Sequence, residues 1–124
     1  MTPEILAALL LFNSTFARLK ASHAPDVRAF VAAQPGEPND ELARYAWTKC
    51  VPESKVFVVQ PTAYLLTQPE YSIRLAAGHE VCHLAAHPAL ICNGFWDQLP
   101  ARRREIEAEM DTCAMKMLAE EAMR

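Results

Sequence analysis

Apolar positions near the N-terminus follow the period of an α-helix. They recur at Leu6, Leu9, Leu10, Phe16 and Leu19, a spacing that is typical of an amphipathic helix. Thr2 is a suitable N-cap residue, and Pro3 and Glu4 are residue types that favour a first turn. We therefore expect a helix over residues 3–20.

Two later stretches also have helical character. The Thr-Gln-Pro-Glu sequence at residues 67–70 matches a capping box with a proline just inside it. It predicts a helix over residues 68–87 that ends before Pro88, because proline cannot continue a helix. Residues 100–122 are rich in strong helix formers and predict a long C-terminal helix.

One segment has the composition of a β-strand. Residues 55–60, Lys-Val-Phe-Val-Val-Gln, combine β-branched and aromatic side chains and stop at Pro61. Elsewhere the pattern is weaker, and we expect a short helix over 25–33, loops over 35–40 and 88–100, and either a short helix or the start of a strand over 41–49. This order of elements predicts an α+β fold.

The composition is that of a folded domain. The chain has 124 residues, of which 52% are hydrophobic and 22% charged, so it should form a packed core. This length suits a single domain over residues 1–124. A net charge of −3 provides no electrostatic surface for DNA or RNA, so we expect no nucleic-acid partner. The basic run Arg102–Arg104 is followed at once by acidic residues.

No membrane partner is expected from the hydropathy pattern. The apolar run Ile5–Phe12 has eight residues, fewer than the roughly 20 of a transmembrane helix. The sequence before it is acidic rather than basic, unlike a signal peptide. We therefore expect a cytoplasmic location.

The four cysteines, Cys50, Cys82, Cys92 and Cys113, could form two disulfides in three ways. In a cytoplasmic protein we expect reduced thiols instead. No two of them have Cys-x-x-Cys spacing, so a zinc site made of cysteines alone is not expected.

The most informative sequence is the HExxH pattern His79-Glu80-Val81-Cys82-His83 on the predicted 68–87 helix. Two histidines four residues apart lie about 40° apart around a helix and one turn along it, so both imidazoles can reach one metal ion. Glu80 lies beside them, close enough to take a proton from water at such an ion. The alternative is an ordinary histidine pair on a helix.

Two acidic residues of the predicted C-terminal helix lie at the edge of its apolar stripe. Glu107 and Asp111 lie beside the core-facing residues, whereas Glu105 and Glu109 fall on the solvent side. Carboxylates so close to a core need a metal, a cation or several hydrogen-bond donors. A third zinc ligand and its neighbour would meet that need, and so would ion pairs with Arg103 or Arg104.

This combination resembles gluzincin metallopeptidases, in which HExxH is followed downstream by a helical glutamate. It is similar to the ImmA/IrrE-type zinc peptidases and the related membrane-associated prenyl-protein and heat-shock peptidases, whose second motif is E-x-x-A-[DN]-x-F-A-x-x-L-L. Glu107, Asp111, Ala114 and Leu118 match that motif, whereas Met110 and Cys113 depart from it. The resemblance covers residues 45–120, where the strand at 55–60 corresponds to the edge strand that holds extended substrate by β-augmentation.

The resemblance implies a minimal zincin-like domain with a short sheet, an HExxH helix and a C-terminal glutamate helix. It implies that His79, His83 and Glu107 bind Zn²⁺ and that the substrate is a peptide or protein. Three protein ligands leave one tetrahedral position for water, as a catalytic site requires. Glu80 would be the general base, and Asp111 is a candidate hydrogen-bond partner of a ligand histidine.

Other side chains compete for the third ligand position. Asp111 in that role would make an aspartate-type zincin. His87 continues the four-residue spacing but lies about 12 Å along the helix axis from the first histidine, too far to share one ion. Cys113 is expected on the core side, Cys92 in a loop, and Cys82 packed beside the histidines.

Many gluzincins have a tyrosine or histidine after the ligand glutamate that stabilises the oxyanion, and no such residue follows here. The donor would have to come from Tyr45, Tyr64, Tyr71, His23, His87 or the Arg102–Arg104 run. Three arginines in a first turn oppose the helix dipole. They bind a substrate carboxylate, or else form a solvated basic turn paired with Glu105. Phe95 and Trp96 either line the cleft or cover the core.

Three functions are compatible with these observations. The first is a small zinc-dependent peptidase, whose activity is weak, latent or partner-dependent because little chain follows the glutamate helix. The second is a zinc-binding module that regulates or binds a protein without cleaving it, an interpretation that the missing oxyanion donor favours and Glu80 disfavours. The third is a helical interaction protein in which the HExxH pattern has arisen by chance.

Overall fold

The computed structural model describes residues 1–38 and 44–124. Helix α1 spans Pro3–His23, and strands β1, β2 and β3 span Ala29–Val31, Ala46–Val51 and Val56–Pro61. Helices α2, α3 and α4 span Glu70–Ala86, Pro88–Asn93 and Pro100–Ala122. Two short 3₁₀ turns, η2 and η3, span Leu65–Thr67 and Phe95–Asp97. The predicted α+β fold is confirmed.

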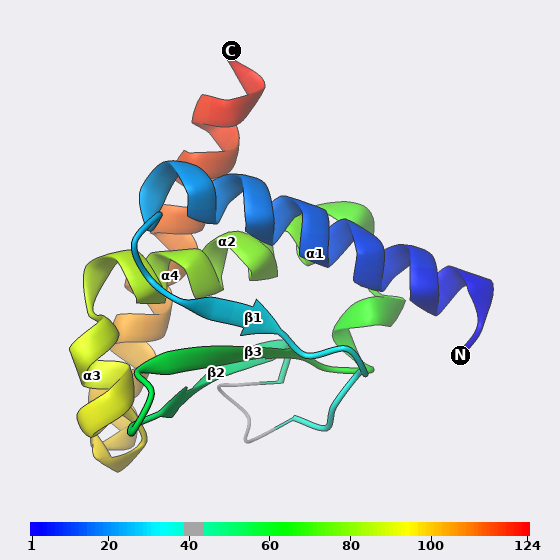
Figure 1. Cartoon of the computed structure of the whole chain (residues 1–124). Coiled ribbons are helices and arrows are strands. Elements are labelled where there is room, and N and C mark those ends of the chain that lie inside the picture. Colours follow the sequence, from blue (N-terminus) through cyan, green and yellow to red (C-terminus); the bar gives the residue numbers. More distant parts are fainter. Residues whose placement is uncertain (39–43) are drawn as a thin grey trace.

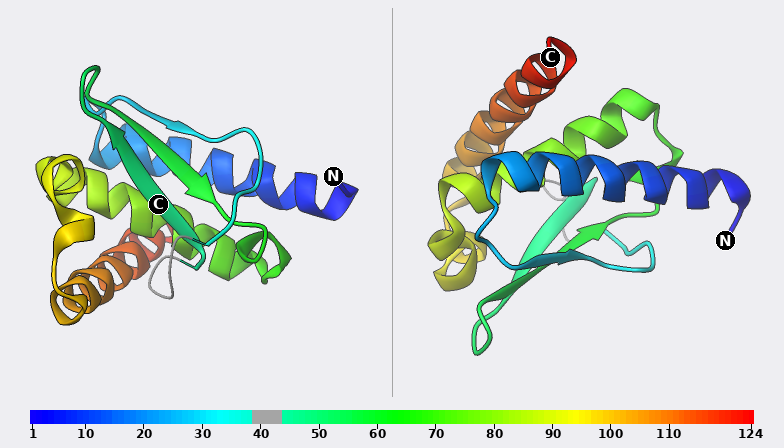
Figure 2. Two further views of the ribbon diagram at one scale, coloured as in Figure 1. Left: turned by 90° about the horizontal axis from the view of Figure 1, so that it is seen from below. Right: turned by 45° about the horizontal axis from the view of Figure 1, so that its top comes forward.

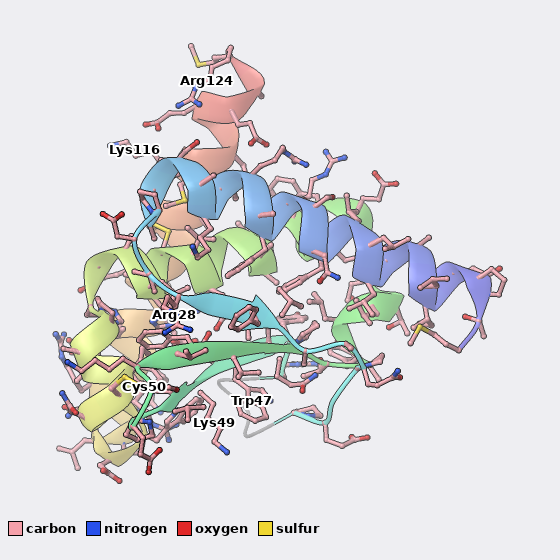
Figure 3. All side chains as sticks on the ribbon, viewed as in Figure 1. Arg28, Trp47, Lys49, Cys50, Lys116 and Arg124 are labelled. Carbon is pink, nitrogen blue, oxygen red and sulfur yellow. A yellow bond between two sulfur atoms is a disulfide. The ribbon has the colours of Figure 1, made fainter. Side chains whose placement is uncertain are left out.

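The three strands form a mixed sheet in the order β1-β3-β2, with β1 parallel and β2 antiparallel to β3. Helices α1 and α2 lie over one face of the sheet (Figure 1), and β3 buries Phe57 and Val59. Trp47 and Lys49 point to the other face (Figure 3), which no helix of the described residues covers when the sheet is seen from below (Figure 2). The core therefore lies between the sheet and the helices.

Helix α1 begins where its sequence predicts, because the Thr2 hydroxyl accepts a hydrogen bond from the Ile5 amide at 3.2 Å. Its buried face differs in part from the predicted one, since Leu6 and Leu10 are 48% and 58% exposed. Within the described residues, α1 is the one helix long and apolar enough to cross a membrane, and one third of that stretch is buried in the fold. Core helices and signal sequences share these properties.

Helices α2 and α4 are confirmed close to their predicted bounds. The predicted capping box is wrong, because Pro69 is the N-cap of α2 and the Thr67 hydroxyl donates to the Tyr64 carbonyl at 2.7 Å. The two helices cross closely where Gly78 faces Ala114. A Cβ atom at Gly78 would lie 3.1 Å from that of Ala114.

The irregular segments contain more structure than the sequence predicts. Residues 25–33 contain β1 rather than a helix, because Ala29–Val31 pairs with β3 across a long stretch of chain. The ambiguous stretch 41–49 contains the start of β2, while its residues up to 43 lie outside the described part. The predicted loop 88–100 contains α3 and η3.

The prediction that residues 55–60 form an edge strand is wrong, because β1 and β2 are the edge strands of the sheet. Strand β3 is central, with partners on both sides. The hydrophobic pattern of residues 55–60 reports burial, which is greatest in a central strand.

The cysteines are paired, so the prediction of reduced thiols is wrong for this structure. Cys50 on β2 bonds to Cys92 on α3, and Cys82 on α2 bonds to Cys113 on α4. The Cα atoms of these pairs are 4.9 and 6.2 Å apart, within the usual range for disulfides. The cytoplasmic location stays a prediction. The paired cysteines do not support it, because disulfides are typical of oxidising compartments.

Candidate metal centre

Helix α2 brings two histidines together in the interior. His79 and His83 are 9% and 3% exposed, and their Nε2 atoms lie 3.1 Å apart. The pairing follows from the four-residue spacing, which puts the two rings on one side of the helix. His79, Glu80 and His83 each offer a ligand atom, and these atoms lie within 4.8 Å of one another. These three residues could therefore hold a metal ion.

Glu107 reaches the same point from α4, which crosses α2. Its Oε2 lies 3.0 Å from Nε2 of His79, and its Oε1 lies 2.7 Å from Nε2 of His83. Ligands about 2.0–2.1 Å from a tetrahedral ion lie about 3.3 Å from one another. The three side chains are thus slightly closer than a metal would hold them, and a small outward shift would admit one.

Asp111 lies behind His79, one helical turn after Glu107. Its Oδ1 is 2.7 Å from Nδ1 of His79. A carboxylate only accepts, so Nδ1 carries the proton and donates it to Asp111. In neutral His79 this leaves the lone pair at Nε2, which faces both Glu107 and the Nε2 atom of His83. The site therefore needs a cation at this point, either a second proton or a metal ion.

The pKa values of the metal-free site express this need. Burial lowers the pKa of His79, but hydrogen bonds to Asp111 and Glu107 and the charge of Glu80 outweigh it and raise that pKa to about 10. Burial raises the pKa of Glu107, but hydrogen bonds from His79 and His83 lower it to about 2. A proton thus takes the place that a divalent ion could fill, and the carboxylates of Glu80, Glu107 and Asp111 supply the negative charge around it.

Glu80 is oriented by a residue that sequence reasoning missed. The Thr48 hydroxyl donates to Oε1 of Glu80 at 2.7 Å, and the other oxygen, Oε2, lies 3.8 Å from Nε2 of His79. Glu80 is 3% exposed and Thr48 2%. The sequence signals the inward position of Thr48 through the alternation of Ala46, Thr48 and Cys50 along a strand. That signal can be used once residues 46–51 are known to form a strand.

The competing ligands do not reach this point. Asp111 contacts Nδ1 rather than Nε2 of His79. His87 stacks edge-on against His83 with ring centroids 5.0 Å apart, and its ring nitrogens have no hydrogen-bond partner among the described residues. Burial and the neighbouring His83 lower the pKa of His87. Cys82 and its partner are held in their disulfide.

A cleft opens on one side of the histidines. It has a volume of about 460 Å³ and includes His79, Glu80, Glu107 and Asp111 in its walls. Tyr45, Arg44 and Arg104 line it as well, together with Ala46, Ser72, Leu75, Ala76 and Ala108. Of the side chains predicted as oxyanion donors, Tyr45 and Arg104 are therefore at the cleft.

The other side of the site is closed. Phe95 packs edge-on against His83, with ring centroids 5.3 Å apart, and Trp96 packs on Phe95 at 5.1 Å. With Glu107 they surround a space of only about 10 Å³. Phe95 and Trp96 therefore form the rear wall of the site rather than the open cleft.

Comparisons of the chain with models of protein families, with curated proteins and with solved structures find no match.

Proposed function

We propose that the protein is a small zinc-dependent peptidase. The observation that carries the proposal is the meeting of His79 Nε2, His83 Nε2 and the Glu107 carboxylate at one buried point, while Asp111 occupies the other ring nitrogen of His79. Two imidazoles and one carboxylate, each from a rigid helix, form the ligand set of many catalytic zinc sites. The HExxH resemblance supports the same conclusion.

The donor set favours zinc over harder cations. Magnesium and calcium prefer oxygen ligands, whereas imidazole nitrogens suit zinc and its neighbours among the transition metals. A zinc ion held by His79, His83 and Glu107 would supply Lewis-acid polarisation of a carbonyl and acidify water.

The side chains of this protein then have separate tasks. Glu80 is buried, and its Oε1 is occupied by Thr48, so its Oε2 faces the histidines and is the oxygen available to accept a proton and return it to a leaving amine. Asp111 holds the His79 tautomer that leaves Nε2 unprotonated. Tyr45 or Arg104, at the cleft, is placed to donate to a developing oxyanion.

The position of β2 supports a peptide as substrate. Strand β2 lies at the edge of the sheet, Thr48 in this strand holds Glu80, and Ala46 lines the cleft. An extended peptide along this edge would present its carbonyl groups toward the candidate metal point.

The test begins with metal content and continues with one substitution. Purified protein should contain one zinc per chain, and removal of zinc by a chelator should lower the melting temperature. Glu80→Gln should keep the zinc and lose cleavage of a peptide library, while Glu105→Gln, an exposed residue paired with Arg102, should keep both. A chain that binds no zinc contradicts the proposal. If the unaltered protein binds zinc but cleaves no peptide that the Glu80→Gln variant leaves uncut, the protein is a metal-binding module rather than a peptidase.

A further inference from the structure

The cleft beside the candidate metal centre contains more positive charge than the proposed chemistry needs, because Tyr45 alone can serve as the oxyanion donor. Its carboxylates all have partners: Glu80 accepts from Thr48, Glu107 contacts both histidines and Asp111 contacts His79. Its two arginines come from different parts of the chain, Arg44 just before β2 and Arg104 from α4. Among the described residues no carboxylate lies within ion-pair distance of either.

Helix geometry places Arg104 close to the reacting centre. Residues 104, 107, 108 and 111 share one face of α4, since they are three, four and seven residues apart. The Cα atoms of Arg104 and Glu107 are about 4.5 Å apart along the axis. A residue in an extended peptide advances about 3.3 Å. The Arg104 guanidinium can therefore meet a group one or two residues from the scissile bond.

Arg44 also lines the cleft, and two aromatic rings hold it. Its guanidinium carbon is 4.6 Å from the ring centroid of Tyr64 and 5.5 Å from that of Tyr45, and the two rings stack on each other at 5.6 Å. Such stacking leaves the edge N–H groups of a guanidinium free to bind a carboxylate.

The site is open toward the cleft and closed beyond His83. The open cleft is at the lower end of the volume range of small-ligand pockets. Phe95 and Trp96 leave only about 10 Å³ beyond His83. The open space at the site is therefore the cleft that Arg44 and Arg104 line, and a group of the substrate held there lies beside both arginines.

From these observations, and resting on the proposed function, we infer that the substrates are peptides with a carboxylate within two residues of the scissile bond, bound by Arg104 with Arg44. The carboxylate is either the C-terminal one or that of an acidic side chain. A guanidinium and a carboxylate form a paired, charge-assisted hydrogen bond, which is stronger than a neutral one.

The test measures binding, not cleavage. The probe is a succinyl-hydroxamate of alanine, whose hydroxamate binds zinc and whose succinyl unit takes the place of the first residue after the scissile bond. It is used with a free C-terminal carboxylate in one form and a carboxamide in the other. A third probe, with glutamate in place of alanine and an amidated C-terminus, tests the side-chain source. Titration calorimetry on the zinc-loaded protein should show the free acid, the glutamate amide, or both, binding about tenfold more tightly than the alanine amide.

The variant Arg104→Gln should abolish this preference, and Arg102→Gln, whose arginine is exposed and paired with Glu105 at 3.0 Å, should preserve it. Equal affinity of all three probes for the unaltered protein overturns the inference and leaves the zinc site standing. An equal loss of affinity for acid and amide in Arg104→Gln also overturns it, since this is the result expected of an oxyanion donor. Failure of every probe to bind contradicts the proposed function itself.

Discussion

The Asp111→Asn substitution tests how the site is organised behind its first layer of ligands. Asp111 accepts a hydrogen bond from Nδ1 of His79 at 2.7 Å, and that bond keeps Nε2 free to bind a metal. Asparagine is nearly isosteric and can still accept with its amide oxygen, but it has no charge. The substitution therefore removes the electrostatic support of the histidine while keeping its shape.

The expected loss follows from the exposure of Asp111. Replacing the partner of a ligand histidine typically costs 10- to 100-fold in metal affinity. The Asp111 side chain is 56% exposed, so solvent screens much of its charge, and the lower end of the range applies. We expect the zinc dissociation constant to rise about tenfold, which corresponds to about 1.4 kcal/mol.

Competition with a chromophoric chelator at fixed pH measures this dissociation constant directly. Glu109→Gln is the matched control, because it removes one charge from an exposed position on the same helix. Near-ultraviolet circular dichroism should confirm that both variants are folded. If Asp111→Asn binds zinc as tightly as the Glu109→Gln control does, the hydrogen bond to Nδ1 does not support a metal ligand and the reasoning is refuted.

Further predictions concern the stability of the fold. In metal-free protein the pKa of His79 is raised, so its protonation stabilises the fold fully below pH 6.5 and this contribution is lost as the pH rises toward 10. The pKa of Glu107 is lowered, so its ionisation stabilises the fold above pH 4.5 and this contribution is lost as the pH falls toward 2. Urea unfolding should therefore show a maximum between pH 4.5 and 6.5, and a stability that stays constant from pH 6.5 to pH 10 would contradict this. Thr48→Val should leave Glu80 buried without its donor and lower the free energy of unfolding by about 1–3 kcal/mol, whereas an unchanged value would show that Glu80 finds another partner. Replacing both Cys82 and Cys113 by alanine removes a link across 31 residues and should lower the free energy of unfolding in urea by about 3–4 kcal/mol. A reductant that leaves Cys50–Cys92 intact should not lower the stability of this variant further, and an unchanged free energy of unfolding in the variant would contradict the prediction.

The local half of the site could be predicted because it depends on one helix. The relation between His79, Glu80 and His83 is fixed by helical geometry once residues 68–87 are recognised as helical. Glu107 and Asp111 could be singled out for a similar reason, since their place at the edge of an apolar stripe is a property of one helix. The sequence could not show that these two helices cross with the stripe edge facing the histidines.

Three features that the sequence did not predict have a common physical origin in contacts between distant segments. Residues 29–31 become a strand because β3 offers them backbone hydrogen bonds, which outweighs their local preference. Strand 56–61 is central because a second partner joins it. The pairing of Cys82 with Cys113 depends on the same helix crossing that joins Gly78 to Ala114.

The sequence by itself determined the three long helices α1, α2 and α4, the α+β class and the chemical types that meet at the site, because hydrophobic period and side-chain chemistry are local properties. Only the tertiary structure decided how they are used. It placed Glu107 between the histidines, Asp111 behind them and Thr48 on Glu80, and it closed one side of the site with aromatic rings while leaving two arginines in the open cleft. Each of these arrangements requires separate elements to pack at one relative position, and that position is set by the whole core rather than by any one segment.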